Sequence, residues 1–61
     1  MFETYWIYTN AGVKVGQFNV CNIGMIIEFM TEQQFIAHKF HEACRYMRID
    51  PRQHNYCIAA E

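Results

Sequence analysis

The side chains best suited to bind a metal ion or to act as nucleophiles are three cysteines and three histidines: Cys21, His38, His41, Cys44, His54 and Cys57. Thiolates and imidazoles are the usual ligands of zinc, and His41 and Cys44 are close enough along a helix to share an ion. A closed zinc site, however, is built from paired ligands such as CxxC, and the sequence contains no such pair. We therefore expect no metal and no cofactor, with Cys44 acting as a small apolar core residue.

Covalent catalysis also finds little support in the sequence. The chain has no serine, and none of its thiols lies beside a residue that would act as its base. The segment from His38 to Glu42 differs from the HExxH motif, because its glutamate lies outside the histidine pair. A chain of 61 residues also leaves little room for a substrate cavity with convergent polar groups. We expect that the protein is not an enzyme.

The stretch from Thr31 to Arg48 predicts one amphipathic helix, because its apolar residues recur at helical spacing. The apolar stripe contains six residues: Ile36, Ala37, Phe40, Ala43, Cys44 and Met47. The polar residues that fall opposite are Gln34, His38, His41, Arg45 and Arg48. Thr31 and Gln34 have the spacing of a capping box, and Asp50-Pro51 ends the helix because proline disfavours helical geometry at the residue before it.

Three apolar stretches precede the helix and predict an antiparallel meander. Phe2–Thr9 and Val13–Val20 are rich in aromatic and β-branched residues, and Met25–Met30 is a third apolar run. Asn10-Ala11-Gly12 and Asn22-Ile23-Gly24 suit three-residue hairpin loops that end in a left-handed glycine. The expected fold is therefore α+β, with a three-stranded meander packed on one helix in a single domain, residues 1–61.

The second strand changes its alternation at Gly16-Gln17, which predicts a β-bulge there. In the simplest register Trp6 lies across from Gly16, and Tyr8 lies across from Lys14, whose ammonium would rest on the phenol ring. We assign one face of the sheet to the helix; its residues are Tyr5, Ile7, Val13, Val15, Phe18 and Val20. Phe2, Trp6 and Tyr8 are left on the opposite face.

The C-terminal stretch allows two interpretations. Asp50-Pro51 followed by Gln53 suits a short helix with proline at its first position. Tyr56-Cys57-Ile58 suits a short edge strand, which is the preferred interpretation of this element.

The composition is unusually aromatic for so small a chain, with 52% apolar, 16% aromatic and only 18% charged residues. A domain of this size cannot bury all of these side chains, so part of them is expected in an interface. The expected partner-binding residues combine the second sheet face with two aromatics that flank the helix stripe: Phe2, Trp6, Tyr8, Phe35 and Tyr46. Their partner is another protein, or a second copy in a homodimer.

Nucleic acid is not the expected partner, because the net charge is −1 and only Lys14 among the basic residues precedes residue 39. The alternative is a basic helix face made of His38, His41, Arg45, Arg48 and Arg52. Over residues 2–48 the expected topology is similar to that of DNA-binding domains of plant transcription factors and recombinase arms. Those domains read DNA with an arginine-rich sheet, whereas this sheet offers Lys14 alone.

The sequence lacks both a secretory signal pattern and an apolar run of membrane-spanning length, which predicts a cytoplasmic protein without a membrane association. In size and composition it resembles the small inhibitors of phages and other mobile elements, such as antitoxins and anti-CRISPR proteins. The expected function is that of a stoichiometric inhibitor that binds a larger protein. A structural homo-oligomer is the remaining alternative.

Overall fold

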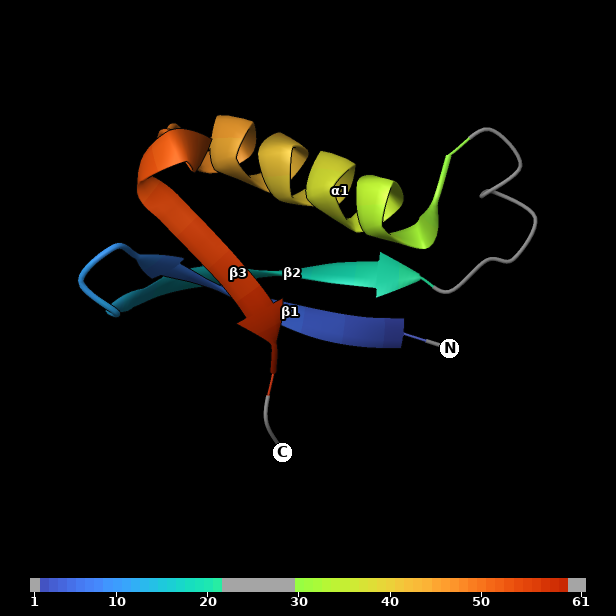
Figure 1. Ribbon diagram of the computed structural model, residues 1–61. Coiled ribbons are helices and arrows are strands. Elements are labelled where there is room, and N and C mark those ends of the chain that lie inside the picture. Colours follow the sequence, from blue (N-terminus) through green and yellow to red (C-terminus); the bar gives the residue numbers. More distant parts are fainter. Residues whose placement is uncertain (1, 22–29, 60–61) are drawn as a thin grey trace.

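The protein is an α+β unit in which one helix packs on one face of a three-stranded antiparallel sheet (Figure 1). The computed structural model describes residues 2–21 and 30–59. Its elements in chain order are β1 (Phe2–Thr9), β2 (Lys14–Cys21), α1 (Glu32–Met47), the 3-10 helix η2 (Pro51–Gln53) and β3 (His54–Ile58). The strand order is β2-β1-β3, so β1 is the central strand. The predicted fold class is confirmed.

The hairpin between β1 and β2 has the predicted three-residue loop. The Thr9 amide donates to the Val13 carbonyl at 2.9 Å, and the Gly12 amide donates to the Thr9 carbonyl at 2.9 Å. Gly12 has a φ of 87°, a conformation that glycine adopts without the steric cost that a side chain would add. The chain therefore reverses at the predicted residue, and both strands begin from a defined register.

A β-bulge lies in β2, one residue before the predicted position. Ile7 pairs with Gly16 and Tyr8 pairs with Lys14, which leaves Val15 without an opposite residue. Trp6 consequently lies across from Gln17 and not across from Gly16.

The third strand of the sheet comes from the C-terminus. β3 pairs with β1 in antiparallel register, with Trp6 opposite Cys57 and Tyr8 opposite Asn55. The preferred interpretation of the C-terminal stretch as a strand is confirmed, and the alternative short helix is present too, as η2 just before it. The predicted strand Met25–Met30 and the second predicted loop lie outside the described residues, except for Met30.

The helix has the predicted start and the predicted faces. The Gln34 amide donates to the Thr31 hydroxyl at 3.1 Å, and the Gln34 side-chain oxygen accepts from the Thr31 amide at 3.0 Å. This reciprocal capping box satisfies two amides that would otherwise lack partners. Ile36, Phe40 and Cys44 are the buried helix residues, as their spacing along the helix predicted.

The helix ends after Met47, where Arg48 adopts a left-handed conformation with a φ of 61°. The Arg48 amide donates to the Arg45 carbonyl at 3.2 Å, and the Ile49 amide donates to the Cys44 carbonyl at 2.9 Å. This is the hydrogen-bond pattern with which many helices end, although glycine usually takes the left-handed position. The left-handed residue turns the chain back toward the sheet.

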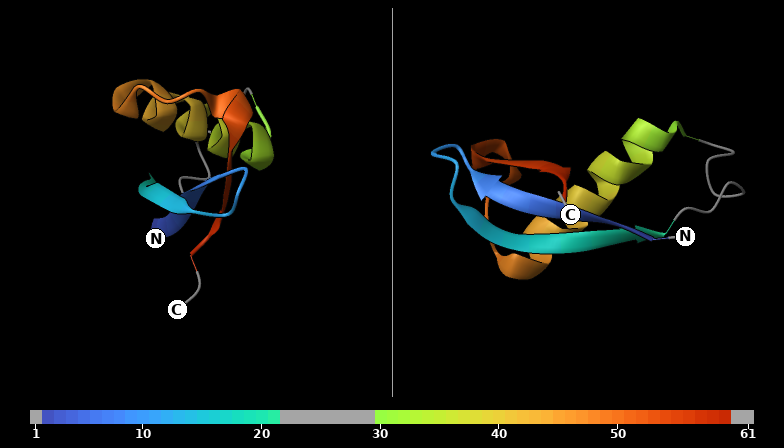
Figure 2. Two further views of the ribbon diagram at one scale, coloured as in Figure 1. Left: turned by 90° about the vertical axis from the view of Figure 1, so that its left-hand side faces the viewer. Right: turned by 90° about the horizontal axis from the view of Figure 1, so that it is seen from below.

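The core lies between the sheet and the helix. Its buried residues are Ile7, Phe18, Val20, Ile36, Phe40 and Cys44. In the left view of Figure 2, α1 lies above the strands, on one side of the sheet. The assignment of Tyr5, Ile7, Phe18 and Val20 to the helix side is confirmed, whereas the assignment of two valines is wrong: Val13 is 59% exposed and Val15 is 40% exposed.

The bulge explains why Val15 is not buried. Because Val15 is the extra residue, Gly16 takes the position opposite the buried Ile7. Met47 of the helix lies over this glycine: a Cβ atom added there would be 2.5 Å from the Met47 Cε and 2.9 Å from its Sδ. Gly16 thus leaves room for the end of the helix, and its opposite residue is Ile7, not Trp6 as predicted.

Candidate binding surface

The face of the sheet that points away from α1 is the main candidate surface, and we call it the outer face. Its residues follow from the register and from the alternation of side chains along each strand. They are Thr4, Trp6, Tyr8, Lys14, Gln17, Asn19, Asn55 and Cys57. Trp6 is at the centre, because Gln17 lies opposite it on β2 and Cys57 lies opposite it on β3.

Two aromatic rings and one cation occupy the middle of the outer face. The Trp6 and Tyr8 rings meet edge to face, with centroids 6.3 Å apart and an angle of 67° between planes. The Lys14 Nζ lies 4.5 Å from the Trp6 ring centroid and 3.4 Å from the Gln17 side-chain oxygen. Both aromatic residues remain partly exposed.

The predicted contact between Lys14 and the Tyr8 ring is wrong, because the ammonium lies on Trp6 instead. Lys14 is opposite Tyr8 in the register, so its side chain reaches a diagonal neighbour. Long side chains reach such neighbours readily across a sheet. The indole also attracts a cation more strongly than a phenol does.

Short polar side chains border this aromatic centre. The Thr4 hydroxyl donates to the Asn19 side-chain oxygen at 2.9 Å. At the other end, the Asn55 amide group donates to the Asn10 side-chain oxygen at 3.4 Å. An apolar centre with a hydrogen-bonding rim is the usual composition of a protein–protein interface. The outer face is therefore suited to bind a protein surface.

Burial and the neighbouring Cys57 side chain raise the pKa of the Tyr8 hydroxyl above its ordinary value. Cys57 itself is exposed. All three cysteines are free thiols; Cys44 is buried, and this burial raises its pKa.

The structure separates the five predicted partner-binding residues. Trp6 and Tyr8 are in contact on the outer face, whereas Phe35 and Tyr46 belong to the helix on the other side of the sheet. Phe35 packs partly on the core, and Tyr46 is 90% exposed. Phe2 begins β1, but its side chain lies outside what is described.

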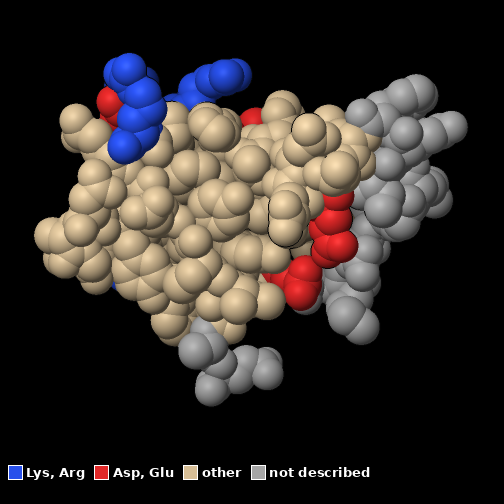
Figure 3. All heavy atoms as spheres, in the orientation of Figure 1, with Lys and Arg blue, Asp and Glu red and all other residues tan. Residues whose placement is uncertain are grey.

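The basic helix face is exposed as predicted. His38, His41, Arg45 and Arg48 all point into solvent. Figure 3 shows Lys and Arg side chains along the upper edge of the molecule, above a broad uncharged surface. His38 pairs with Glu42 at 3.6 Å, so the stripe also contains an acidic neighbour.

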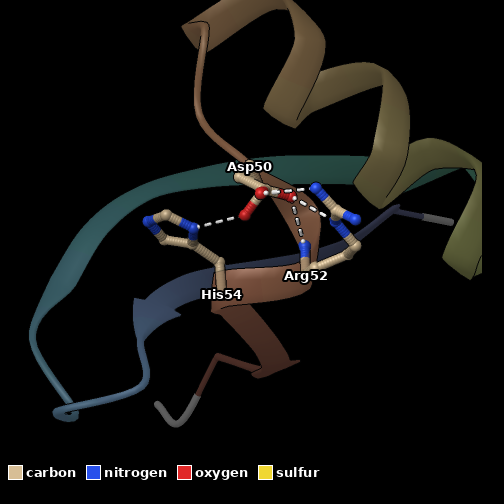
Figure 4. Close-up of polar contacts among 3 residues, drawn as sticks. All are labelled: Asp50, Arg52 and His54. Carbon is tan, nitrogen blue, oxygen red and sulfur yellow. Dashed lines mark hydrogen bonds and ion pairs between the residues drawn. The ribbon is translucent and has the colours of Figure 1, made fainter.

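Arg52, the last predicted residue of this basic face, is held by Asp50 (Figure 4). The Asp50 Oδ1 accepts from the Arg52 amide at 2.9 Å and from its Nε at 3.3 Å, while Oδ2 accepts from Nη2 at 3.3 Å. A ring nitrogen of His54 is hydrogen-bonded to the Asp50 carbonyl at 2.7 Å. The bonds from Arg52 lower the pKa of Asp50 below its ordinary value. These bonds fix the turn that leads from α1 into β3.

Other kinds of site are not seen in the described part of the chain. Residues 2–21 and 30–59 contain no group of three metal-binding side chains and no buried polar or charged side chain. In the same residues, no helix is long and apolar enough to cross a membrane.

Sequence reasoning missed the contribution of Cys57, Asn55 and Gln17 to the outer face. Alternation along a strand places Cys57 on the same face as Asn55 and on the face opposite to Tyr56. Nothing local showed that this strand pairs with β1, and so brings Cys57 next to Trp6.

Comparisons with protein-family models, with curated proteins and with solved structures gave no match for this chain. A proposal for its function therefore depends on the chemistry of its surfaces. Of these surfaces, the outer face combines partly exposed aromatic rings, a cation and hydrogen-bonding groups on one sheet.

Proposed function

We propose that the protein is a non-enzymatic binding module that recognises another protein through its outer face. One observation carries the proposal: the Trp6–Tyr8 pair is partly exposed on a sheet face that the helix does not cover. Tryptophan and tyrosine are enriched among the residues that dominate binding energy. Because both side chains project from the central strand, they are held in place before binding, which limits the entropy cost of association.

The proposed role is stoichiometric inhibition of a larger protein, of the kind carried out by antitoxins and anti-CRISPR proteins of phages and mobile elements. Blocking an active site or an assembly surface requires a complementary patch and no chemistry from the inhibitor. Three free thiols suit a reducing cytosol as the place of action. A homodimer is a second proposal, and the surface that would form it is considered below.

The test is affinity capture from a native lysate with three forms of the chain: the wild type, Trp6→Glu and Tyr46→Glu. Both variants replace an aromatic residue by the same charge, one on the outer face and one at the most exposed aromatic of the helix. We expect a captured protein that Trp6→Glu loses and Tyr46→Glu retains. The captured protein is then purified, and its activity is titrated with the chain to an equimolar end point.

Two results would contradict the proposal. Capture that survives Trp6→Glu but is lost with Tyr46→Glu would place binding on the helix. Capture that is lost after nuclease treatment, or in an Arg45→Glu/Arg48→Glu double variant alone, would instead support the nucleic-acid alternative. Circular dichroism of each variant establishes that the fold is retained.

A further inference from the structure

The free edge of β3 has a defined pattern of backbone groups. The Ala59 amide donates to the Thr4 carbonyl at 2.8 Å, and these two residues continue the β1–β3 register one position beyond the pair of Tyr5 and Ile58. In an antiparallel pair, opposite residues alternate between hydrogen-bonded and non-hydrogen-bonded pairs. The backbone groups of Tyr56 and Ile58 therefore point away from β1, toward the free edge.

This edge lacks the features that usually prevent strands from associating. β3 has no lysine, no proline and no bulge, and in the described part of the chain it pairs with β1 only. The other edge strand, β2, contains Lys14 and the bulge at Val15. Charges and bulges are common means of protecting an edge. Within residues 2–21 and 30–59, β3 is thus the edge that carries no such protection.

We infer that β3 pairs in antiparallel register with β3 of a second copy, with the two-fold axis at Cys57. In this register the Tyr56 backbone forms a hydrogen-bonded pair with the second copy's Ile58, and symmetry repeats the pair on the other side of the axis. Closed two-fold pairing of identical surfaces is the commonest form of oligomer. The result is one continuous sheet of six strands. This inference does not depend on the proposed target.

The choice of register follows from a backbone group that is already occupied. Centring the axis on Tyr56 would pair His54 with the second copy's Ile58. The His54 amide, however, donates to the Pro51 carbonyl, so that register would lack a donor. Centring it on Cys57 uses only the free groups of Tyr56 and Ile58.

Side chains favour the same register. Ile58 is 55% exposed, and it would pack against the tyrosine of the other copy on the helix side of the sheet. Aromatic and β-branched residues form favourable cross-strand pairs. β3 carries no lysine, arginine, aspartate or glutamate, so no like charges of these types meet at the axis. The outer faces of the two copies then join, which places two Trp6–Tyr8 clusters on one surface.

The inferred axis is open to a chemical test. Residues in a non-hydrogen-bonded antiparallel pair have Cα atoms about 4.5 Å apart, within the range that a disulfide spans. Added oxidised glutathione should therefore link the two Cys57 thiols: one disulfide forms, and the glutathione disulfide accepts two electrons and two protons to become two thiols. We expect a covalent dimer on a non-reducing gel for the wild type and for Cys21→Ser, and none for Cys57→Ser.

Sedimentation at micromolar concentration tests the backbone pairing without any covalent bond. Ile58→Pro removes an amide that faces the free edge and leaves the bonds to β1 in place, while Ile58→Val is the matched control. We expect twice the monomer mass for the wild type and Ile58→Val, and the monomer mass for Ile58→Pro. Ile58→Lys, which keeps the amide but brings two ammonium groups to the interface, should also be monomeric, and circular dichroism checks its fold.

A monomeric wild type, a disulfide through Cys21, or an Ile58→Pro variant that folds and stays dimeric would each overturn the inference. Trp6→Glu separates this dimer from the proposed target site. It should abolish capture of the target and leave the dimer intact. A Trp6→Glu chain that folds but sediments as a monomer would place the dimer contact on the outer face and so contradict pairing through β3.

Discussion

The two faces of the central strand β1 carry equally apolar side chains but have different surroundings. On one face, Ile7 is fully buried under the helix and packs in the core. On the other face, Trp6 contacts Tyr8 and Lys14, and both aromatic residues remain partly exposed. Alternation along one strand therefore produces a surface that holds the fold together and a second surface that the fold leaves open.

The difference shows that apolar content alone does not identify a core. One helix shields one face of a sheet, and an antiparallel sheet with an open face usually carries polar side chains there. The aromatic pair of the outer face departs from that pattern, which is the reason for our proposal that it binds a partner. Variants that affect stability on one face and not on the other test this distinction.

The largest expected effect is on the inner face. Phe40 is 4% exposed. Its ring centroid lies 4.7 Å from the ring centroid of Tyr56 and 6.1 Å from that of Phe18. Phe40→Ala should lower the free energy of unfolding by about 3–5 kcal/mol, since it removes a buried ring and leaves a cavity. For a small domain this loss is comparable to the whole stability. Urea titration measures it.

Two variants outside the core provide the comparison. Trp6→Ala on the outer face should cost roughly 1–2 kcal/mol, because it removes an edge-to-face contact and a cation–π contact of a side chain that is only partly buried. His38→Ala on the exposed helix face should change stability by no more than about 0.5 kcal/mol. A loss for Trp6→Ala as large as that for Phe40→Ala would mean that the outer face is part of the core.

The cysteines report on the two faces through their reactivity. Cys44 is buried and its pKa is raised by that burial, whereas Cys57 is exposed on the outer face. In the reduced native protein, a thiol reagent should modify Cys57 at least about a hundredfold faster than Cys44, since Cys44 must wait for the chain to open. Peptide mass spectrometry over time assigns each rate. Equal rates in the native protein would show that the inner face is not closed.

A gain in stability is expected from a position outside both faces. Arg48 adopts a left-handed conformation, which is unfavourable for residues with a side chain. Arg48→Gly should raise the free energy of unfolding by about 1 kcal/mol, because glycine suits the end of a helix. Arg48→Ala is the control, since it removes the charge and keeps the unfavourable Cβ atom. A gain for alanine equal to that for glycine would assign the effect to charge.

The smallest effect concerns the turn that brings β3 to the sheet. Hydrogen bonds from Arg52 lower the pKa of Asp50 in the folded state. The Asp50 carboxylate therefore adds to the free energy of unfolding at pH values above the ordinary pKa of aspartate, about 3.9. This contribution is lost as the pH falls through the lower pKa that Asp50 has in the folded state. Asp50→Asn should make the decrease in thermal midpoint between neutral and acidic pH shallower. Glu42→Gln, on the exposed helix face, controls for the loss of one carboxylate; if it has the same effect, the turn is not responsible.

Much of the local structure could be predicted from the sequence, because it depends on neighbours along the chain. The limits of β1 and α1, the glycine turn at Gly12 and the capping box at Thr31 were all predicted. The buried stripe of the helix was also predicted, since helical spacing places its residues on one side. Trp6 and Tyr8 were assigned to the face away from the helix by the same kind of reasoning.

The tertiary structure decided which strands are neighbours. β3 lies beside β1 although 44 residues, numbered 10–53, separate Thr9 from its opposite residue, His54. The alternation of apolar and polar residues along the chain does not predict a pairing between strands so far apart. The same pairing places Cys57 opposite Trp6 and leaves the Tyr56 and Ile58 backbone groups at a free edge. The bulge at Val15 was predicted only to within a residue, and the exposure of Val13 and Val15 was not predicted. Alternation along the chain also did not show that Met47 packs over Gly16. Periodicity tells which side chains of an element share a face, but only contacts between distant segments decide what that face meets.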